Sequence, residues 1–364
     1  MEGIPDRNLV CLGGLPFDAV GMDEAVDRVC AAAKTRQPLF VSTPNLNFMI
    51  AAQHDAAFRD SVVHSDLSIV DGMPLVWMAR LLGLPVRERV PGSGLFEALR
   101  AGAGSAKLGR PLTVYFFGGP VGVAARACAR INEWGTAMRC VGFHCPGFGS
   151  VADMSGQAVI DEINASGADF LVVSLGAKKG QAWIEYNRGR LAVPVISHLG
   201  AVVNFVAGTV NRAPVSWQRW GLEWLWRIKE EPALVKRYAA DGWQLLAMVV
   251  GRVLPYALWL RRHPAPATDG TVTVARSGDD ARIVVDGALT GTALAALGKE
   301  VAERRDSPGR VVVDLAGCSY LGSGFFGIAA ACESRGGRLE FAGVPAQQRR
   351  LFDWNGLGFL LAKR

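Results

Sequence analysis

The sequence has few of the residues that build metal centres or disulfide frameworks. Among its 364 residues are seven cysteines and five histidines. The cysteines are scattered, odd in number and never form a CxxC pair, which indicates reduced thiols in a cytosolic protein rather than a disulfide framework. His144 and His198 have no partner at the spacing of metal ligands. We therefore expect no metal site.

The signatures of two large nucleotide-binding classes are also missing. Glycines follow strand-like runs in Phe117-Gly-Gly-Pro120 and in Leu175-Gly-Ala-Lys-Lys-Gly180. Neither stretch fits GxGxxG or GxxxxGK[ST], which disfavours a dinucleotide-dependent oxidoreductase and a P-loop enzyme. Gly118, Gly119 and Gly176 remain candidates for backbone contacts with a nucleotide.

Three further absences narrow the class. Residues 1–7 lack the basic start and the apolar stretch of a secretory signal, so we expect a cytoplasmic protein. No internal repeat relates the two halves of the chain. No nucleic-acid-binding module is recognisable, so nucleic acid is not an expected partner.

Positive charge is concentrated in one region. The chain carries a formal net charge of +6 and has 50% hydrophobic residues, enough for about two domains. Residues 212–262 hold nine Lys and Arg against four Asp and Glu, a local net charge of +5. This excess favours a phosphate-bearing partner or an anionic membrane surface.

Short β-branched runs alternate with helical stretches in the first 200 residues. Helices are expected at 22–36 and 46–59. Each β-like run meets a glycine within a few residues; the runs lie at 38–44, 65–72, 112–117, 138–143, 170–175 and 193–197. This repetition predicts a Rossmann-like α/β fold with a mainly parallel sheet, whose ligands bind at the carboxyl ends of the strands.

Polar side chains at the ends of two early strands suggest a sugar site. Asp71 follows an apolar run, where a catalytic carboxylate would lie, although an ordinary Asp-Gly turn explains it as well. Thr43 and Asn45 follow the preceding strand, and hydroxyl and amide groups beside a carboxylate suit hydroxylated ligands. Arg89 can bind phosphate or pair with Glu88 or a distant acid.

The segment at 211–238 combines aromatic side chains with fixed positive charge. On a helix, Trp217, Trp220 and Trp224 would share one face, and forked guanidinium groups beside them would suit a diphosphate. An amphipathic helix with docked tryptophans and solvated arginines is the alternative. The stretch at 243–260 has the length of a membrane span, but Arg252 and Pro255 interrupt it, which favours an interfacial or core-docked helix.

Six motifs carry a resemblance to a known family. They are Ser-Thr-Pro-Asn-Leu-Asn at 42–47, Ser-Asp-Leu-Ser-Ile-Val-Asp-Gly-Met-Pro-Leu-Val at 65–76, Arg-Glu-Arg-Val-Pro-Gly at 87–92, Tyr-Phe-Phe-Gly-Gly at 115–119, Gly-Phe-His-Cys-Pro-Gly-Phe at 142–148 and Gly-Leu-Glu-Trp-Leu-Trp-Arg-Ile at 221–228. Over residues 8–240 the chain resembles the WecG/TagA/CpsF glycosyltransferases, glycosyltransferase family 26. The resemblance implies a hexosyltransferase that moves a sugar, with inversion and without a metal or another cofactor, from a UDP-sugar to a polyprenyl-diphosphate-linked saccharide.

The resemblance also implies roles for individual residues. Asp71 would be the general base, Thr43 and Asn45 would line the sugar site, and Arg89 would meet the phosphates. The segment at 211–262 would be the family's appendage, which closes over the site and touches the inner face of the membrane. An inverting transfer needs one carboxylate near the attacking hydroxyl, and arginines must meet the charge of the departing UDP. The arginines of the appendage assigned to this task are Arg212, Arg219 and Arg227.

The chain departs from the family pattern at two places. The usual Gly-x-Pro-x-Gln-Glu is Gly-Ala-Lys-Lys-Gly-Gln at 176–181, and the usual Phe-Asp-Phe is Val-Asn-Phe at 203–205. Lys178 and Lys179, with Gln181, could replace lost hydrogen bonds to the donor with charge. The identity of the donated sugar therefore stays open.

Residues 271–364 resemble a STAS domain, the small α/β fold of anti-sigma factor antagonists. Its second helix opens with Ser-Tyr-Leu-Gly-Ser-Gly at 319–324, where Gly322 occupies the usual phospho-acceptor position and Ser323 is expected as a helix N-cap. We expect a docking or oligomerisation module. The predicted divisions are a glycosyltransferase domain at 1–210, a membrane-associating helical appendage at 211–262, a linker at 263–270 and the STAS domain at 271–364.

The leading hypothesis is a glycosyltransferase, peripheral on the inner membrane face, that builds an exopolysaccharide, a capsule or a related glycan. The alternative is a non-catalytic scaffold that recruits partners through its STAS domain. The altered segment at 176–181 favours the scaffold, whereas Asp71, Thr43, Asn45 and Arg89 favour the enzyme.

Overall fold

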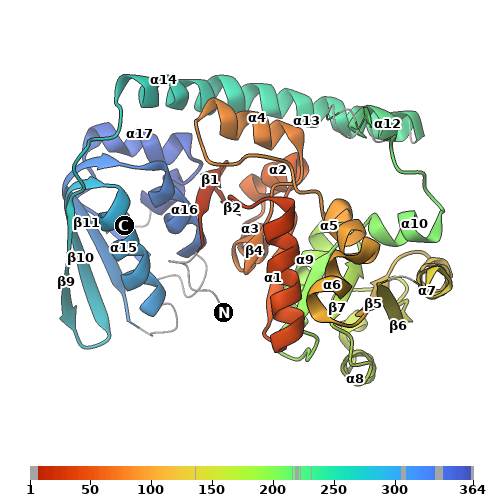
Figure 1. Cartoon of the computed structure of the whole chain (residues 1–364). Coiled ribbons are helices and arrows are strands. Elements are labelled where there is room, and N and C mark those ends of the chain that lie inside the picture. The colour runs from red at the N-terminus through yellow and green to blue at the C-terminus, as the bar shows by residue number, and fades with distance from the viewer. Residues whose placement is uncertain are drawn as a thin grey trace.

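The larger domain is built on a six-stranded sheet in which all pairings are parallel. The computed structural model describes residues 7–135, 137–214, 216–217, 221, 223–230, 232–304, 309–332 and 339–361. The strand order is β4-β3-β8-β7-β5-β6. These strands are β3 (Leu39–Ser42), β4 (Leu67–Ser68), β5 (Leu112–Gly118), β6 (Met138–His144), β7 (Phe170–Ser174) and β8 (Val195–His198). The predicted Rossmann-like α/β fold is confirmed (Figure 1).

Helices cover both faces of this sheet, because neighbouring strand residues point to opposite sides. One buried cluster joins the sheet to α1 (Met22–Thr35), α5 (Gly92–Ala98), α7 (Val123–Trp134) and α10 (Val202–Ala207). The other face packs against α8 (Gln157–Ala165) and α9 (Ala177–Asn187). Short segments η2 (Leu99–Ala103) and α6 (Gly104–Leu108) continue α5.

A hairpin and three helices form a further core beside the sheet. The hairpin is β1 (Leu9–Leu12) and β2 (Leu15–Asp18), and the helices are α2 (Leu46–His54), α3 (Ala56–Val63) and α4 (Met73–Leu81). The single helix expected at 46–59 is wrong. Asp55 has an extended backbone and accepts a hydrogen bond from the Phe58 nitrogen at 3.0 Å, so it ends α2 and caps α3.

The expectation of uniformly reduced thiols also fails in the structure. Cys128 of α7 and Cys140 of β6 form a disulfide, with their Cα atoms 5.1 Å apart. The two residues meet because α7 packs on β6, an arrangement that the scattered spacing of cysteines along the chain does not reveal. Cys11, Cys30, Cys145 and Cys318 are not part of a disulfide.

A long helical rod follows the sheet domain and runs along one side of the molecule (Figure 1). It consists of α12 (Glu223–Glu230), η4 (Pro232–Leu234), α13 (Val235–Met248), the π-helical turn η5 (Val249–Val253) and α14 (Leu254–Arg262). Pro255 lies in the first turn of α14, where its missing N–H is tolerated after the irregular turn. Within the described residues, Pro232–Arg262 is long and apolar enough to cross a membrane by length and composition.

The C-terminal domain is a four-stranded sheet with helices packed on it. The order is β12-β11-β10-β9, with β9 antiparallel to β10 and the other pairings parallel. The strands are β9 (Thr271–Ser277), β10 (Asp280–Leu289), β11 (Val311–Leu321) and β12 (Leu339–Ala342), and the helices are α15 (Gly291–Glu303), α16 (Ser323–Cys332), α17 (Ala346–Trp354) and η6 (Gly358–Leu361). Ser323 is the first residue of α16, one position inside the expected N-cap.

The C-terminal domain docks on the hairpin of the larger domain. A Cβ added to Gly327 of α16 would lie 2.5 Å from the Leu9 carbonyl oxygen, so only glycine permits this approach. The Cys11 thiol donates to the Asn355 carbonyl at 3.4 Å and is buried in the core of the C-terminal domain. The C-terminal domain thus packs on its own chain, and its expected role in docking or oligomerisation stays a prediction.

The rod is held by the same domain at its far end. Tyr256 of α14 is 1% exposed and lies between Phe326 and Trp354, with ring centroids 6.3 and 6.2 Å away. Trp259 stacks on Tyr320 at 5.8 Å. The C-terminal domain thus fixes the α14 end of the rod, and α12 lies at the opposite end.

Candidate active site

Asp71 lies in the loop that leaves the carboxyl end of β4. Its backbone nitrogen donates to the Pro44 carbonyl at 3.1 Å, which joins this loop to the one that follows β3. The carboxylate Oδ2 accepts a hydrogen bond of 3.3 Å from the Gly92 nitrogen at the start of α5. The side chain is neither fully buried nor freely solvated. Parallel packing of β3 and β4 therefore brings Asp71 to the sheet edge where α/β proteins bind ligands.

Thr43 and Asn45 reach the same place from the end of β3. A Cβ on Gly92 would lie 2.9 Å from Thr43 Cγ2, so the threonine lies against the backbone that contacts Asp71. Asn45 caps α2, with its Oδ1 accepting from the Phe48 nitrogen at 3.2 Å. The structure thus brings together Thr43, Asn45 and Asp71, as the sequence predicts.

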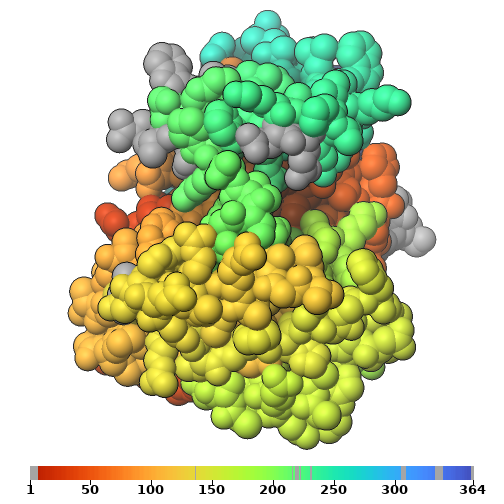
Figure 2. All heavy atoms as spheres, turned by 90° about the vertical axis from the view of Figure 1, so that its right-hand side faces the viewer, coloured from red at the N-terminus to blue at the C-terminus, as the bar shows by residue number. Residues whose placement is uncertain are grey.

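The appendage covers this edge of the sheet. Arg89 donates to the Glu223 carboxylate of α12 at 3.0 Å, and the two side chains are only 13% and 21% exposed. Arg212 donates to the Ser93 hydroxyl at 3.2 Å. Gly221 approaches α4 so closely that an added Cβ would lie 2.5 Å from Met73 Cγ. Three independent contacts hold the segment over the Asp71 loop, and Figure 2 shows the green chain after α10 crossing this face of the molecule.

The surroundings of Asp71 perturb its acidity. Burial raises the pKa of the carboxyl from 3.8 to about 6, and the negative charge of Glu223 acts in the same direction. Arg89, Arg227 and the hydrogen bond from Gly92 oppose this rise. A carboxylate with a pKa of about 6 still loses its proton at neutral pH and is a stronger base than an ordinary aspartate.

The aromatic side chains of the appendage contact one another beside this site. Trp217 and Trp226 meet edge to face at 6.0 Å, and the Trp226 indole donates to the Asn211 carbonyl at 3.4 Å. Trp224 remains 42% exposed. Arg219 and Trp220, both singled out from the sequence, lie outside the described residues. The predicted tryptophan face therefore stays a prediction.

The glycine junctions form a second part of the same edge. Gly118 and Gly119 end β5 with φ of +96° and +86°, and the Gly119 nitrogen donates to the Ser174 carbonyl at the end of β7 at 2.8 Å. Gly176 caps α9 and faces open space. Gly119 and Gly176 leave backbone accessible beside the carboxyl ends of β5 and β7, whereas Gly118 is buried against Ser174 and Leu175.

Three predicted donor-binding residues make contacts of their own, and only Gln181, through Ser42, adjoins the Asp71 cluster. Lys178 pairs with Asp55 at 2.9 Å, and the Lys179 ammonium donates to the Gly149 carbonyl at 2.9 Å. The Gln181 amide is 1% exposed and donates to the Ser42 hydroxyl at 3.0 Å, beneath the sheet edge. In this structure all three serve contacts within the fold.

Two contributors were not predicted. Glu223 lies in the quoted Gly-Leu-Glu-Trp motif, but its pairing with Arg89 across 134 residues has no local signal. Ser93 meets Arg212 through an equally distant contact. No group of three or more His, Cys, Asp or Glu suited to a metal ion occurs in the described part of the chain.

Comparisons with protein families agree with this architecture. The model described as the glycosyl transferase WecG/TagA/CpsF family matches residues 10–257. The model described as Mlab, STAS domain, matches residues 272–362. The first match covers well over half of the chain and contains every residue of the Asp71 cluster. The chain thus belongs to the WecG/TagA/CpsF glycosyltransferases of cell-surface glycan synthesis and carries a C-terminal STAS domain.

Proposed function

We propose that this glycosyltransferase moves a hexosyl unit from a UDP-sugar to a polyprenyl-diphosphate-linked saccharide, with inversion at the sugar carbon, in the synthesis of an exopolysaccharide, a capsule or a related glycan. The main support is the cluster around Asp71. A single carboxylate with a raised pKa lies at the ligand-binding edge of the sheet, and Arg89, Arg212 and Arg227 lie around it.

Asp71 would accept the proton of the acceptor hydroxyl as its oxygen attacks the anomeric carbon of the donor. The bond from that carbon to the UDP oxygen breaks on the opposite face, and UDP leaves with the electron pair. The guanidinium groups of Arg89 and Arg227 would offset the charge that develops on the phosphates. In this proposal the protein itself supplies the positive charge, without a metal ion.

The donor nucleotide would lie along the glycine junctions. Gly119 and Gly176 offer close approach of phosphate or ribose to the backbone at the ends of β5 and β7, and the predicted Gly118 is buried beneath them. Lys178 and Lys179 would have to leave Asp55 and the Gly149 carbonyl to reach the donor. Their contribution to donor binding is therefore expected to be smaller than that of the glycine backbone.

We propose that the rod lies on the inner face of the membrane. Its outer surface is an apolar stripe at helical spacing, formed by Trp243, Leu246, Val250, Leu254 and Leu258, whose exposed fractions run from 40% to 72%. Its inner surface packs on protein through Met248, Val253 and Tyr256. A helix packed on protein along one side suits an interfacial position, and basic residues near both ends would meet anionic headgroups.

Transfer of radiolabel from a panel of UDP-sugars to a short-chain polyprenyl-diphosphate disaccharide would test the reaction. We expect one donor to label the acceptor lipid, and nuclear magnetic resonance of the product to show inversion. Absence of labelled lipid with every donor, in protein that still unfolds cooperatively, would contradict the proposal.

Flotation with anionic liposomes would test the membrane position. The double change Leu246→Glu and Leu254→Glu places two charges on the apolar stripe and should abolish flotation. Val284→Glu, on an exposed strand of the STAS domain, is the matched control and should float as the natural protein does. Unchanged flotation of the double variant would refute the interfacial position.

A further inference from the structure

A cavity lies where three parts of the chain meet, and its lining does not include Asp71. It has a volume of about 650 Å³, a size that suits a nucleotide-sized ligand. The larger domain contributes His54 and Arg59, the rod contributes Gly251 and Arg252, and the STAS domain contributes residues around α17 and η6. Nothing in the proposed transfer reaction uses this cavity.

The lining combines positive charge with flat aromatic surfaces. The guanidinium of Arg59 lies 4.2 Å from the ring centroid of Phe359, and Trp354 also lines the cavity. Arg252 contacts the Gln53 amide oxygen at 3.5 Å, a long contact that leaves its charge available. Asp353 is an acid in the lining, and the Arg59 guanidinium also lies 3.6 Å from the Asp60 carboxylate. Paired guanidinium groups are the donors best matched to phosphate, and aromatic faces suit a planar ring.

The rod is irregular at the point where it faces this cavity. The π-helical turn η5 contains both Gly251 and Arg252. Such turns cost helix stability and are found frequently at functional sites. A Cβ added to Gly251 would meet nothing within 4 Å, so packing does not require the glycine. Gly251 is exposed, so a larger side chain at this position would project into the space that the cavity provides.

We propose that this cavity is a regulatory site for a nucleotide-sized phosphate ester, whose phosphate is held by Arg59 and Arg252 and whose flat part lies against Trp354. A ligand there touches both domains and the rod at once. Because the rod continues through α13 to α12, which carries Glu223 to the active site, ligand binding would bias the position of the appendage over Asp71. This coupling rests on the proposed function, whereas the binding site does not.

Isothermal titration and thermal unfolding of the full chain would test the binding. The probes are AMP, GMP, CMP and UMP, and short-chain phosphatidic acid below its micelle concentration serves as a phosphate ester without a flat ring. We expect at least one nucleotide to bind more tightly than phosphatidic acid, and the reverse order would refute the aromatic part of the site. Because each guanidinium makes a charge-assisted contact, Arg59→Gln with Arg252→Gln should weaken binding by roughly 10- to 100-fold.

Two further variants separate loss of the site from loss of the fold. Gly251→Leu projects into the open space and should block the probe while leaving the unfolding midpoint without ligand nearly unchanged. Arg261→Gln, an exposed arginine of the same rod that does not line the cavity, should bind as the natural protein does. Binding of no probe, or equal binding by the natural protein and by both cavity variants, would overturn the proposal. A probe that binds at the cavity without changing transfer would retain the site and refute only the coupling.

Discussion

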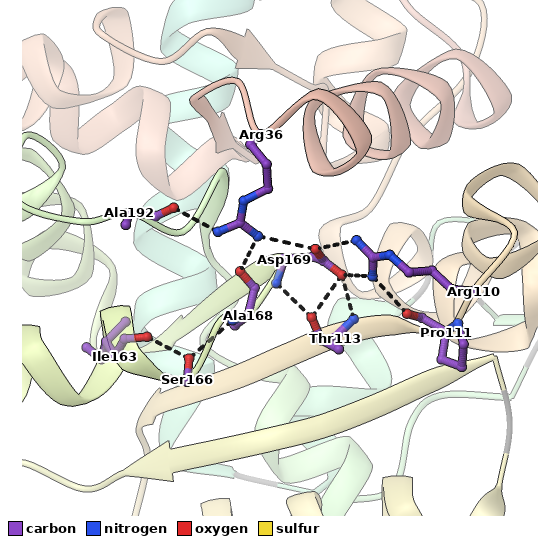
Figure 3. Close-up of polar contacts among 9 residues, drawn as sticks. All are labelled: Arg36, Arg110, Pro111, Thr113, Ile163, Ser166, Ala168, Asp169 and Ala192. Atoms are coloured by element: carbon purple, nitrogen blue, oxygen red, sulfur yellow. Dashed lines mark hydrogen bonds and ion pairs between the residues drawn. The ribbon is translucent and has the colours of Figure 1, made fainter.

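Two aspartates at opposite edges of the same sheet have opposite environments. Asp71 lies at the carboxyl edge with one backbone hydrogen bond from Gly92, and its pKa is raised to about 6. Asp169 lies before β7 at the amino edge and is 1% exposed. Its carboxylate accepts two hydrogen bonds from Arg110, at 2.6 and 2.8 Å, and two from Thr113, at 2.9 and 2.8 Å (Figure 3).

The difference between these acids lies in their partners and not in burial alone. Burial works to raise the pKa of Asp169, but hydrogen bonds from Arg110 and Thr113 outweigh it and leave the pKa below its ordinary value. Arg36 adds a contact at 3.4 Å. A carboxylate so fully paired stabilises the fold and is a poor base, whereas Asp71 retains the capacity to accept a proton.

Loss of the Asp71 carboxylate should have the largest effect. Asp71→Asn should reduce transfer by about 100- to 10,000-fold, because the general base is lost. The raised pKa means that the folded state disfavours the ionised form, so the variant should be more stable at pH 8, by about 2 kcal/mol. This gain should shrink as the pH falls below 6 and should vanish by about pH 3, below the ordinary pKa of 3.8, where the carboxyl is largely protonated in both states. Activity assays with urea unfolding at both pH values would test this, and unchanged transfer would refute the role of base.

Loss of the Asp169 carboxylate should affect stability instead. Asp169→Asn should lower the free energy of unfolding at pH 7 by about 3 kcal/mol, because it weakens a charged network around Arg110. The lowered pKa of Asp169 means that its contribution is present above the ordinary pKa and is lost as the pH falls through the folded value. Urea unfolding measures the loss. Transfer per folded molecule should stay unchanged, and a selective loss of transfer would contradict the comparison.

A matched pair of threonines sharpens the comparison. Thr113→Val removes a hydroxyl that donates to Asp169 at 2.8 Å and should cost about 1.5 to 3 kcal/mol of stability without loss of transfer. Thr43→Val keeps the shape beside Gly92 and should reduce transfer with a smaller change in stability. Thermal unfolding would measure the change in stability of both variants, and initial rates would measure the change in transfer. Equal effects of the two changes on stability would argue against a ligand-binding role for Thr43.

The smallest effect is expected from the appendage. Glu223→Gln removes a negative charge that helps to raise the pKa of Asp71 and leaves the positive charge of Arg89 unopposed. In the natural protein, kcat/KM should decrease as the pH drops below about 6, where Asp71 becomes protonated. In the variant this decrease should begin at a lower pH, by less than one unit. Glu185→Gln, on the far helix α9, is the control. A lower rate with an unmoved acid limb would indicate that Glu223 only holds the appendage in place.

The sequence predicts the Asp71 cluster because parallel strands bring their carboxyl ends to one edge. Thr43, Asn45 and Asp71 each follow a strand, so their meeting needs no knowledge of distant contacts. The Arg89–Glu223 pair and the Asp169 network join segments more than 50 residues apart, and nothing local marks them.

Other features could not be predicted from the sequence for related reasons. The break between α2 and α3 depends on the single side chain of Asp55. It accepts a hydrogen bond from the first turn of α3, while the extended backbone of Asp55 ends α2. The Cys128–Cys140 disulfide depends on the packing of α7 against β6. The cavity at the rod is assembled from separate segments of the chain, each unremarkable alone. Sequence patterns predict what one element does, and these features depend on several.

The buried hairpin imposes an order on how the protein is made. Cys11 emerges from the ribosome 344 residues before its partner Asn355, and Leu9 likewise emerges long before Gly327. The hairpin must therefore wait, with apolar surface uncovered, until the segments around Gly327 and Asn355 have been translated. Newly synthesised chains are accordingly exposed to aggregation for most of that interval, and separating the two halves at the linker would make the exposure permanent.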